Sequence, residues 1–310
     1  MTEQNPRYSI GVDLGGTNLR AAAIDSTGRM LGKVAGQTQL SAGPDAVVRD
    51  MVAAIIKLRS EFGEDRLAGI GIGSPGIIVM ETGMIMETPN LPGFEGFPLR
   101  DRVNRALGAP VILENDANAA ALGEKWVGAG KDVDDLILLT LGTGIGGGII
   151  HRGEIMHGAV GMAGELGHIR VVPNGNPCAC GNCGCLEKHA SATAVVTMAR
   201  LMGLGSDLTA EDVSKLAAAG NPRAREVWRV AGQALGAALV SLINIFNPPL
   251  VLLSGGMLGA WDFFAPAMLG EVRQYCYVWR NSPARIEKAL LGNEAGLYGA
   301  ARLPFGEKVA

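Results

Sequence analysis

The chain has 310 residues, of which 48% are hydrophobic and 18% charged, and its formal net charge is −3. A chain of this length exceeds the size at which a single hydrophobic core usually stops growing, so we expect two domains. A slightly acidic chain has no electrostatic attraction for nucleic acid or for an anionic membrane surface, and we expect neither as a partner. Residues 1–7 contain no apolar run behind a basic patch, so we expect no signal peptide and a cytoplasmic location.

The first half of the chain predicts alternating strands and helices. Strands are expected at residues 8–13, 19–25 and 30–39, and a helix between Gly43 and Gly63. A strand at 67–73, with glycine at alternate positions, leads into the turn Ser74-Pro-Gly76. A helix at 99–107 and a strand at 111–114 precede a helix that runs to about Val127, with Asn115 or Asp116 as its N-cap.

The second half repeats this opening pattern. A strand at 136–141 enters the glycine run 142–148, and a strand at 149–150 leaves it. Helices are expected at 190–202 and 210–219, then from Asn221 to about Phe246, followed by a strand at 250–254 and a helix at 296–303. Each half begins with two strands joined by a Gly/Thr turn, which indicates a duplicated α/β fold with a cleft between its halves.

Residues 235–261 carry no charged side chain and therefore need testing as a membrane span. Asn244, Asn247 and the pair Pro248-Pro249 interrupt the segment. Polar and helix-breaking residues at mid-span favour a buried helix followed by a buried strand.

Two turns combine glycine with threonine, Asp13-Leu-Gly-Gly-Thr17 and Gly142-Thr-Gly-Ile-Gly-Gly147. Glycine lets backbone N–H groups converge on an anion and threonine adds a hydroxyl donor, so the two turns together suit a polyphosphate. Each turn alone is equally compatible with a plain hairpin. The second turn matches G-x-G-x-x-G, but a strand rather than a helix follows it, and the chain has no Walker A sequence. Asp13 is predicted to hold a hydrated Mg²⁺, with a turn-capping role as the alternative.

We refer to residues 165–187 as the clasp, because a metal ion is expected to close this segment. Four of the five cysteines lie here, downstream of His168, at Cys178, Cys180, Cys183 and Cys185. Thiolates at this spacing chelate one soft cation, and we expect zinc. A reduced cytosol also favours a metal over disulfides for this cluster. Glu165 and Glu187 stand at the two ends and are expected to face a substrate. Cys276 lies far from the cluster and is expected to be a buried thiol.

The chain resembles the ROK family of bacterial sugar kinases, within the sugar kinase/Hsp70/actin fold, over nearly its whole length. The motifs that carry the resemblance occur in the family's order and are Asp13-Leu-Gly-Gly-Thr-Asn-Leu-Arg20, Glu114-Asn-Asp-Ala-Asn118, Leu141-Gly-Thr-Gly-Ile-Gly-Gly-Gly148, Glu165-Leu-Gly-His168 and Cys178-x-Cys-Gly-x-x-Gly-Cys-x-Glu187. The resemblance implies a two-lobed, ribonuclease H-like α/β fold with an interdomain cleft that closes over a sugar. It implies a discontinuous smaller domain, residues 1–115 plus 297–310, and a larger domain, residues 116–296, that carries the zinc.

The resemblance also implies a reaction, ATP-dependent phosphorylation of glucose at its 6-hydroxyl. Asp116 would be the general base, and the alternative is that it only caps its helix. The residues expected to bind the sugar are Gly76, Asn90, Asn115, Asp116, Glu165, His168 and Glu187. Those expected to bind ATP with Mg²⁺ are Asp13, Gly15, Gly16, Thr17, Thr143, Gly144, Gly255 and Gly256.

In the family a histidine and three cysteines hold a structural zinc, and they match His168, Cys178, Cys180 and Cys185. Cys183 departs from the pattern, and a site built from the four cysteines is the alternative. We expect a homodimer or homotetramer that binds sugar and ATP.

Other functions stay open. The same motifs serve kinases for N-acetylmannosamine, N-acetylglucosamine or fructose. A sugar-responsive regulator is less favoured, because twelve residues before Asp13 are too few for a DNA-binding domain. A zinc-ribbon interaction module would leave both Gly/Thr turns unexplained.

Overall fold

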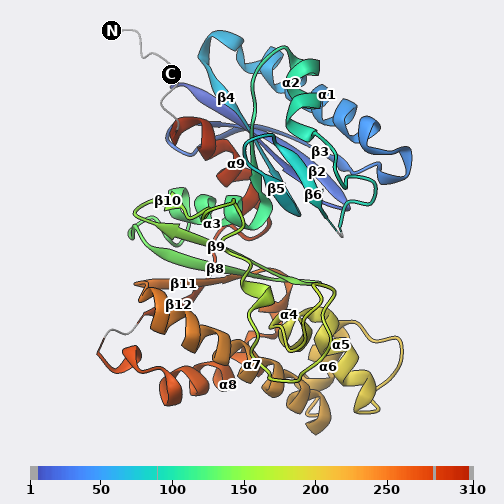
Figure 1. The fold of residues 1–310 in the computed structure, drawn as a ribbon, viewed down its shortest axis with the longest axis vertical. Helices are drawn as coiled ribbons and strands as arrows, with labels where there is room; N and C mark the ends of the chain where they lie inside the picture. Colours follow the sequence, from blue (N-terminus) through green and yellow to red (C-terminus); the bar gives the residue numbers. More distant parts are fainter. Residues whose placement is uncertain (1–5, 89, 282–283, 307–310) are drawn as a thin grey trace. The chain divides into compact units, whose positions relative to one another are not determined.

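The computed structural model describes residues 6–88, 90–281 and 284–306 (Figure 1). The chain divides into two compact units. Unit 1 consists of Met1–Asp134, Gly148–Gly164 and Leu290–Ala310, and unit 2 of Asp135–Gly147 and Glu165–Ala289. The sequence-based division at residues 115 and 116 has different bounds, because helix α3 (Asp116–Val127) belongs to unit 1. That division stays a prediction.

Unit 1 is built on a five-stranded sheet with the order β3-β2-β1-β4-β7. Its strands are β1 (Tyr8–Leu14), β2 (Asn18–Asp25), β3 (Met30–Gln37), β4 (Leu67–Ser74) and β7 (Ile112–Asn115). The first three form an antiparallel meander, while β4 runs parallel to β1 and β7 parallel to β4. The carboxyl ends of β1, β4 and β7 therefore lie at one edge of the sheet.

The two faces of this sheet are covered differently (Figure 1). Large apolar residues of β1, such as Ile10 and Val12, share a core with α1 (Pro44–Phe62) and α2 (Leu99–Leu107). The opposite face receives α9 (Ala295–Gly306) on glycine: a Cβ atom on Gly11 would lie 2.2 Å from the carbonyl oxygen of Leu297. Small residues thus let the backbone of α9 lie directly on the sheet.

Helices α3 and α9 also approach each other through small residues. A Cβ atom on Gly299 of α9 would lie 1.6 Å from the carbonyl oxygen of Ala119 in α3. Near the end of α3, the fully buried Glu124 accepts hydrogen bonds from the backbone N–H groups of Ala129, Leu290 and Leu291. This carboxylate fastens α3 to the segment that leads into α9.

Unit 1 also contains the hairpin of β5 (Ile77–Val79) and β6 (Met84–Glu87), and the short strand β10 (Glu154–Ile155). The second five-stranded sheet has the order β10-β9-β8-β11-β12. Its other strands are β8 (Leu136–Leu141), β9 (Ile145–His151), β11 (Leu250–Ser254) and β12 (Arg285–Lys288), and β8, β11 and β12 are parallel. Because this order repeats that of the first sheet, the predicted duplication is confirmed.

The glycine run 142–148 was expected to be a turn, and for its second half this is wrong. Strand β9 begins at Ile145, so Gly147 and Gly148 lie within the strand. A Cβ atom on Gly147 would lie 2.6 Å from the Leu166 side chain, and one on Gly148 would lie 2.8 Å from the Ala117 carbonyl oxygen. These glycines serve close packing on both faces of the strand.

The helices of unit 2 are α4 (Glu187–Ala190), α5 (Ala192–Leu201), α6 (Ala210–Ala218), α7 (Pro222–Phe246) and α8 (Trp261–Tyr275). Helix α7 is long and apolar enough to cross a membrane by length and composition alone, but half of its most apolar window is buried. Its buried residues include Trp228, Leu235 and Leu239, and the buried strand β11 follows it. The expected buried helix followed by a buried strand is confirmed.

Candidate functional site

In unit 1, several predicted site residues meet at the carboxyl ends of the parallel strands. Asp13 pairs with Gly73 across β1 and β4, and Ser74 pairs with Asn115 across β4 and β7. This edge is where open α/β sheets place their ligands. Gly76 lies two residues after the end of β4, and its carbonyl oxygen accepts a hydrogen bond of 3.2 Å from Asn115 Nδ2. The sheet therefore brings Asp13, Gly76, Asn115 and Asp116 to one region.

Asn115, and not Asp116, is the N-cap of α3. Its Oδ1 accepts hydrogen bonds from the backbone N–H groups of Ala117, at 2.9 Å, and Asn118, at 3.2 Å. Asp116 occupies the first turn, where the helix dipole favours a carboxylate. The N-cap role considered for Asp116 is filled by its neighbour.

A buried polar group lies just before this helix, and sequence reasoning missed it. Glu114 is 2% exposed, and its Oε1 accepts from the Asn115 backbone N–H at 2.8 Å and from Asn118 Nδ2 at 3.0 Å. Its Oε2 lies 2.6 Å from His157 Nε2. This hydrogen bond raises the pKa of His157 and so favours the imidazolium. Glu114 opens a recognised motif, but nothing near His157 in the sequence indicates its partner.

The first Gly/Thr turn lies against Asn90. A Cβ atom on Gly16 would lie 2.6 Å from the Asn90 carbonyl oxygen, so only glycine allows this approach. Gly15 donates its N–H to the Asn18 carbonyl oxygen at 2.9 Å, and Thr17 is exposed. The turn thus leaves Thr17 at the surface.

Asp13 forms an ion pair with Arg20 across the β1–β2 hairpin. Burial raises the pKa of the Asp13 carboxyl, although the Arg20 guanidinium opposes this effect. Arg20 lies 4.0 Å from Glu294, which also pairs with Lys33 at 2.6 Å. Asp13 is therefore the end of a chain of alternating charges.

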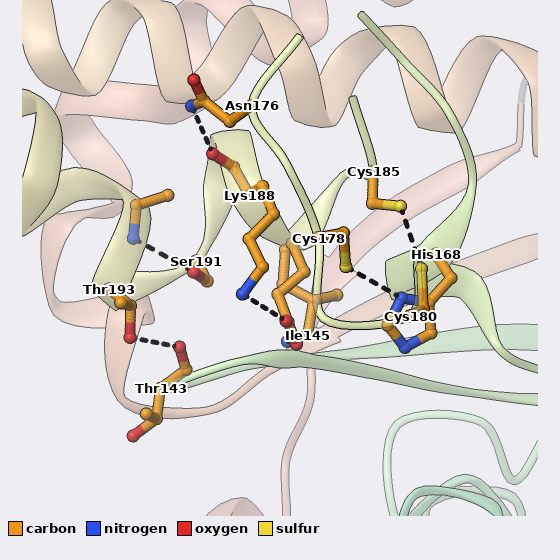
Figure 2. Close-up of polar contacts among 12 residues, drawn as sticks. Thr143, Ile145, His168, Asn176, Cys178, Cys180, Cys185, Lys188, Ser191 and Thr193 are labelled. Carbon is orange, nitrogen blue, oxygen red and sulfur yellow. Dashed lines mark hydrogen bonds and ion pairs between the residues drawn. The ribbon is translucent and has the colours of Figure 1, made fainter. Parts of the chain in front are cut away.

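In unit 2, the second Gly/Thr turn is held by several segments. Thr193 Oγ1, near the start of α5, donates to the Thr143 carbonyl oxygen at 2.8 Å (Figure 2). Gly255 has φ +98°, and a Cβ atom there would lie 2.3 Å from the Leu141 carbonyl oxygen. The pair Gly255–Gly256 therefore begins beside the strand end that enters the turn.

Glu187 also reaches this turn. Its Oε2 accepts from the Ile145 backbone N–H at 3.1 Å, and a Cβ atom on Gly144 would lie 2.3 Å from the same oxygen. Lys188 Nζ lies 3.3 Å from the other carboxylate oxygen (Figure 2). Glu187 thus joins the clasp to the second turn.

Within the clasp, one imidazole and three thiols converge (Figure 2). The ligand atoms of His168, Cys178, Cys180 and Cys185 all lie within 4.8 Å of one another. Cys178 Sγ is 3.6 Å from His168 Nδ1, and Cys180 Sγ is 3.6 Å from Cys185 Sγ. A tetrahedral site with Zn–S bonds of about 2.3 Å would place its sulfur atoms about 3.8 Å apart, so the donor set fits zinc in number, type and spacing. Cys183 is not part of this convergent group.

The second ring nitrogen of His168 lies near a carboxylate. His168 Nε2 lies 3.9 Å from Glu165 Oε2. The backbone N–H of Leu186 donates to the Ile169 carbonyl oxygen at 2.8 Å, and Arg170 forms a bridge with Cys185. This short ladder brings the neighbours of His168 and of Glu187 side by side.

Comparison with known proteins supports the motif assignment. The family model described as "ROK family" matches residues 9–306. A glucokinase from Halalkalibacterium halodurans is 38% identical over 96% of this chain and 94% of its own. A ROK hexokinase from Thermus thermophilus has a TM-score of 0.85 at 36% identity, over 95% of this chain and 96% of that one. A ROK family glucokinase from Streptomyces griseus, solved with glucose and AMPPNP, has a TM-score of 0.78 at 35% identity, over 96% and 98%.

Other relatives have other names. An N-acetylmannosamine kinase from Salmonella arizonae is 32% identical over 96% of this chain and 99% of its own length. A xylose repressor from Caldicellulosiruptor bescii is 29% identical, and this chain spans 79% of it. The family match and the extent of these similarities lead to one conclusion. The chain belongs to the ROK family and has the actin-like α/β fold of its sugar kinases.

Proposed function

We propose that the chain is an ATP-dependent glucokinase that converts glucose to glucose 6-phosphate. The observation that carries the proposal is the start of α3, where Asn115 takes the N-cap and leaves the Asp116 carboxylate on the first turn beside it. The similarity to glucokinases from two organisms, one of them solved with glucose and AMPPNP, supports glucose and ATP as the substrates.

In the proposed reaction Asp116 is the general base. The glucose 6-hydroxyl oxygen bonds to the γ-phosphorus of ATP while the bond from that phosphorus to the β,γ-bridging oxygen breaks. The hydroxyl proton passes to the Asp116 carboxylate, and ADP leaves with the bridging oxygen. Such a transfer depends mainly on positioning and charge neutralisation, so one carboxylate within reach of the hydroxyl suffices.

The other predicted residues bind the two substrates in this proposal. Asn90, Asn115, Glu165, His168 and Glu187 contact sugar hydroxyls through amide, carboxylate and imidazole groups, and Gly76 does so through its backbone. The backbone N–H groups of Gly16 and Gly144, with the hydroxyls of Thr17 and Thr143, bind phosphate oxygens, and Gly15, whose N–H closes the first turn on Asn18, shapes the loop that presents them. Gly255 and Gly256 lie near the adenosine.

Two metal ions belong to the proposal. Mg²⁺ enters with ATP and would neutralise phosphate charge, and Asp13 would hold it through water. The residues fit this role because Gly296 leaves space beside Asp13, where a Cβ atom would lie 3.3 Å from Oδ1. His168, Cys178, Cys180 and Cys185 would hold zinc, since their ligand atoms converge. Four protein ligands leave no open position, so its role is structural. We further propose a cytoplasmic homodimer or homotetramer.

A panel of hexoses assayed for ADP release tests the proposal. We expect the highest kcat/KM with glucose, and a glucose 6-phosphate-specific coupled assay should detect the product. If kcat/KM is higher with N-acetylmannosamine than with glucose, N-acetylmannosamine is the preferred substrate, as the name of the Salmonella arizonae relative suggests. Absence of turnover with glucose, fructose and both N-acetylhexosamines would contradict the kinase assignment.

A further inference from the structure

The Glu114–His157 pair joins two segments of unit 1 that carry or precede predicted site residues. On one side, Glu114 is the last residue but one of β7 and accepts hydrogen bonds from Asn115 and Asn118. These donors flank Asp116, so one carboxylate holds both sides of the first turn of α3. On the other side, His157 opens a loop over residues 157–164 that Glu165 follows directly.

Two contacts hold this loop in a defined conformation. The backbone N–H of Ala163 donates to the His157 carbonyl oxygen at 3.0 Å, which closes the loop on itself. Gly161 has φ +80°, and a Cβ atom there would lie 2.6 Å from the Met80 side chain just after β5. The His157 side chain is therefore presented to Glu114 from a loop that is anchored at its base and at its tip.

We infer that Glu114 and His157 are positioning residues for Asp116. Glu114 fixes the first turn of α3, and His157 holds the Glu114 carboxylate in the orientation that this requires. The inference rests on the proposed kinase function and adds two residues to it. Neither of them needs to touch a substrate.

Charge explains why a histidine is suited to this place. The Glu114 side chain is 3% exposed, and a buried carboxylate without a cationic partner is strongly destabilised. The hydrogen bond to Glu114 raises the pKa of His157, so the pair favours imidazolium with carboxylate. Without that cation, an uncompensated charge two residues from Asp116 would disfavour a second ionised carboxylate on the same turn. Asp116 must be ionised to accept the hydroxyl proton.

Two substitutions at position 157 test the inference on the full-length enzyme. His157→Ala removes the donor, and we expect kcat with glucose to fall by about tenfold to a hundredfold, the range seen when outer-shell partners of metal ligands are removed. The KM for ATP should stay unchanged. His157→Gln keeps an N–H donor near the position of Nε2 and should recover part of the loss. His151→Ala is the matched control, since His151 is exposed on the β9–β10 hairpin that precedes His157, and it should keep wild-type kcat.

A role in stability alone is distinguished from the positioning of Asp116 by measuring kcat per folded protein, at a temperature well below each variant's Tm. A lowered Tm with unchanged kcat for His157→Ala would overturn the inference. The double variant Glu114→Gln/His157→Ala adds a second test, because residues that act through one bond have non-additive effects. We expect the double variant to be no slower than the slower single variant, and multiplied losses would contradict the inference. A wild-type protein without sugar turnover would instead overturn the proposed function and this inference together.

Discussion

Adjacent residues at the start of α3 have separate tasks. Asn115 uses both ends of its amide, accepting from the helix backbone and donating to Gly76. Asp116 is not the N-cap, although its Oδ1 also accepts from the Ala117 backbone N–H at 2.8 Å, so asparagine, which keeps an oxygen acceptor there, should disturb helix capping little. This separation makes the role of Asp116 testable.

We expect Asp116→Asn to fold and to bind glucose like the wild type, because the N-cap and the Gly76 contact belong to Asn115. The amide cannot accept the hydroxyl proton, so kcat should fall by about 10²- to 10⁴-fold, the usual contribution of a general base. Steady-state kinetics and glucose binding by calorimetry, measured on the same sample, check both parts. Activity close to that of the wild type would remove Asp116 as the base.

For individual residues, the sequence predicted functional side chains that lie within one short motif. It did not predict contacts between residues that are far apart in the sequence. Asn115 and Asp116 stand in one recognisable run of residues. His157 lies 43 residues after Glu114, and only the return of the chain through β9 and β10 brings the two together. A lone histidine in a glycine-rich loop has no periodic or spacing signal.

Among the elements, the clasp combines a donor cluster with contacts to neighbouring groups. Its ladder places His168 so that Nδ1 faces the thiols and Nε2 faces Glu165. Glu187 at the other end contacts the second glycine turn. Loss of the metal should therefore also disturb the proposed sugar-binding residues.

We expect metal analysis to find one zinc per chain, held by the imidazole and the three convergent thiols. Cys180→Ser should lose most of the metal, whereas Cys183→Ser should keep it, because Cys183 is outside the convergent group. Chelation should lower both Tm and glucose affinity, since His168 loses the bond that orients its ring. Full zinc loss in Cys183→Ser would favour the four-cysteine site instead.

The elements that the sequence did not predict have weak local signals. Helix α8 contains Pro266, a helix-breaking signal, even though its buried residues Phe264, Met268 and Val272 recur at helical spacing. Strand β12 has four residues, none of them buried, so neither alternation nor an apolar run marks it. In β9 the glycines that suggest a turn are required by α3 and Leu166, which belong to distant parts of the sequence.

At the scale of the whole molecule, unit 1 depends on segments that are remote in sequence. Helix α9 supplies Leu297 and Ala301 to a core with Ala22 and Ile24 of β2. It meets α3 through Gly299, and Glu124 of α3 fastens that helix to the segment that leads into α9. The joint between α3 and α9 is therefore a sensitive point for the stability of unit 1.

We expect Gly299→Ala to destabilise unit 1 by about 1–3 kcal/mol or more, because the added methyl group would force the α3 and α9 backbones apart. Urea unfolding, with hydrogen exchange of the α9 amides as a local readout, measures the effect. Gly270→Ala in α8 is the control. A Cβ atom there meets nothing within 4 Å, so it should stabilise its helix by roughly 0.5–1 kcal/mol. Equal changes in the free energy of unfolding for the two substitutions would contradict the proposed close packing of α3 against α9.

The position of α9 in the sequence sets an order of events during synthesis. The sheet face that receives α9 is made early, but residues 165–289 leave the ribosome before α9 does. At about 5–20 residues per second, the face stays uncovered for on the order of ten seconds. Its contact positions include Gly11, Gly71 and Ala22, which offer little apolar area. The small residues that let the α9 backbone approach the sheet in the folded protein thus have a second effect. They leave little apolar surface exposed on the nascent chain, so this face has little tendency to associate with other hydrophobic surfaces before α9 is made.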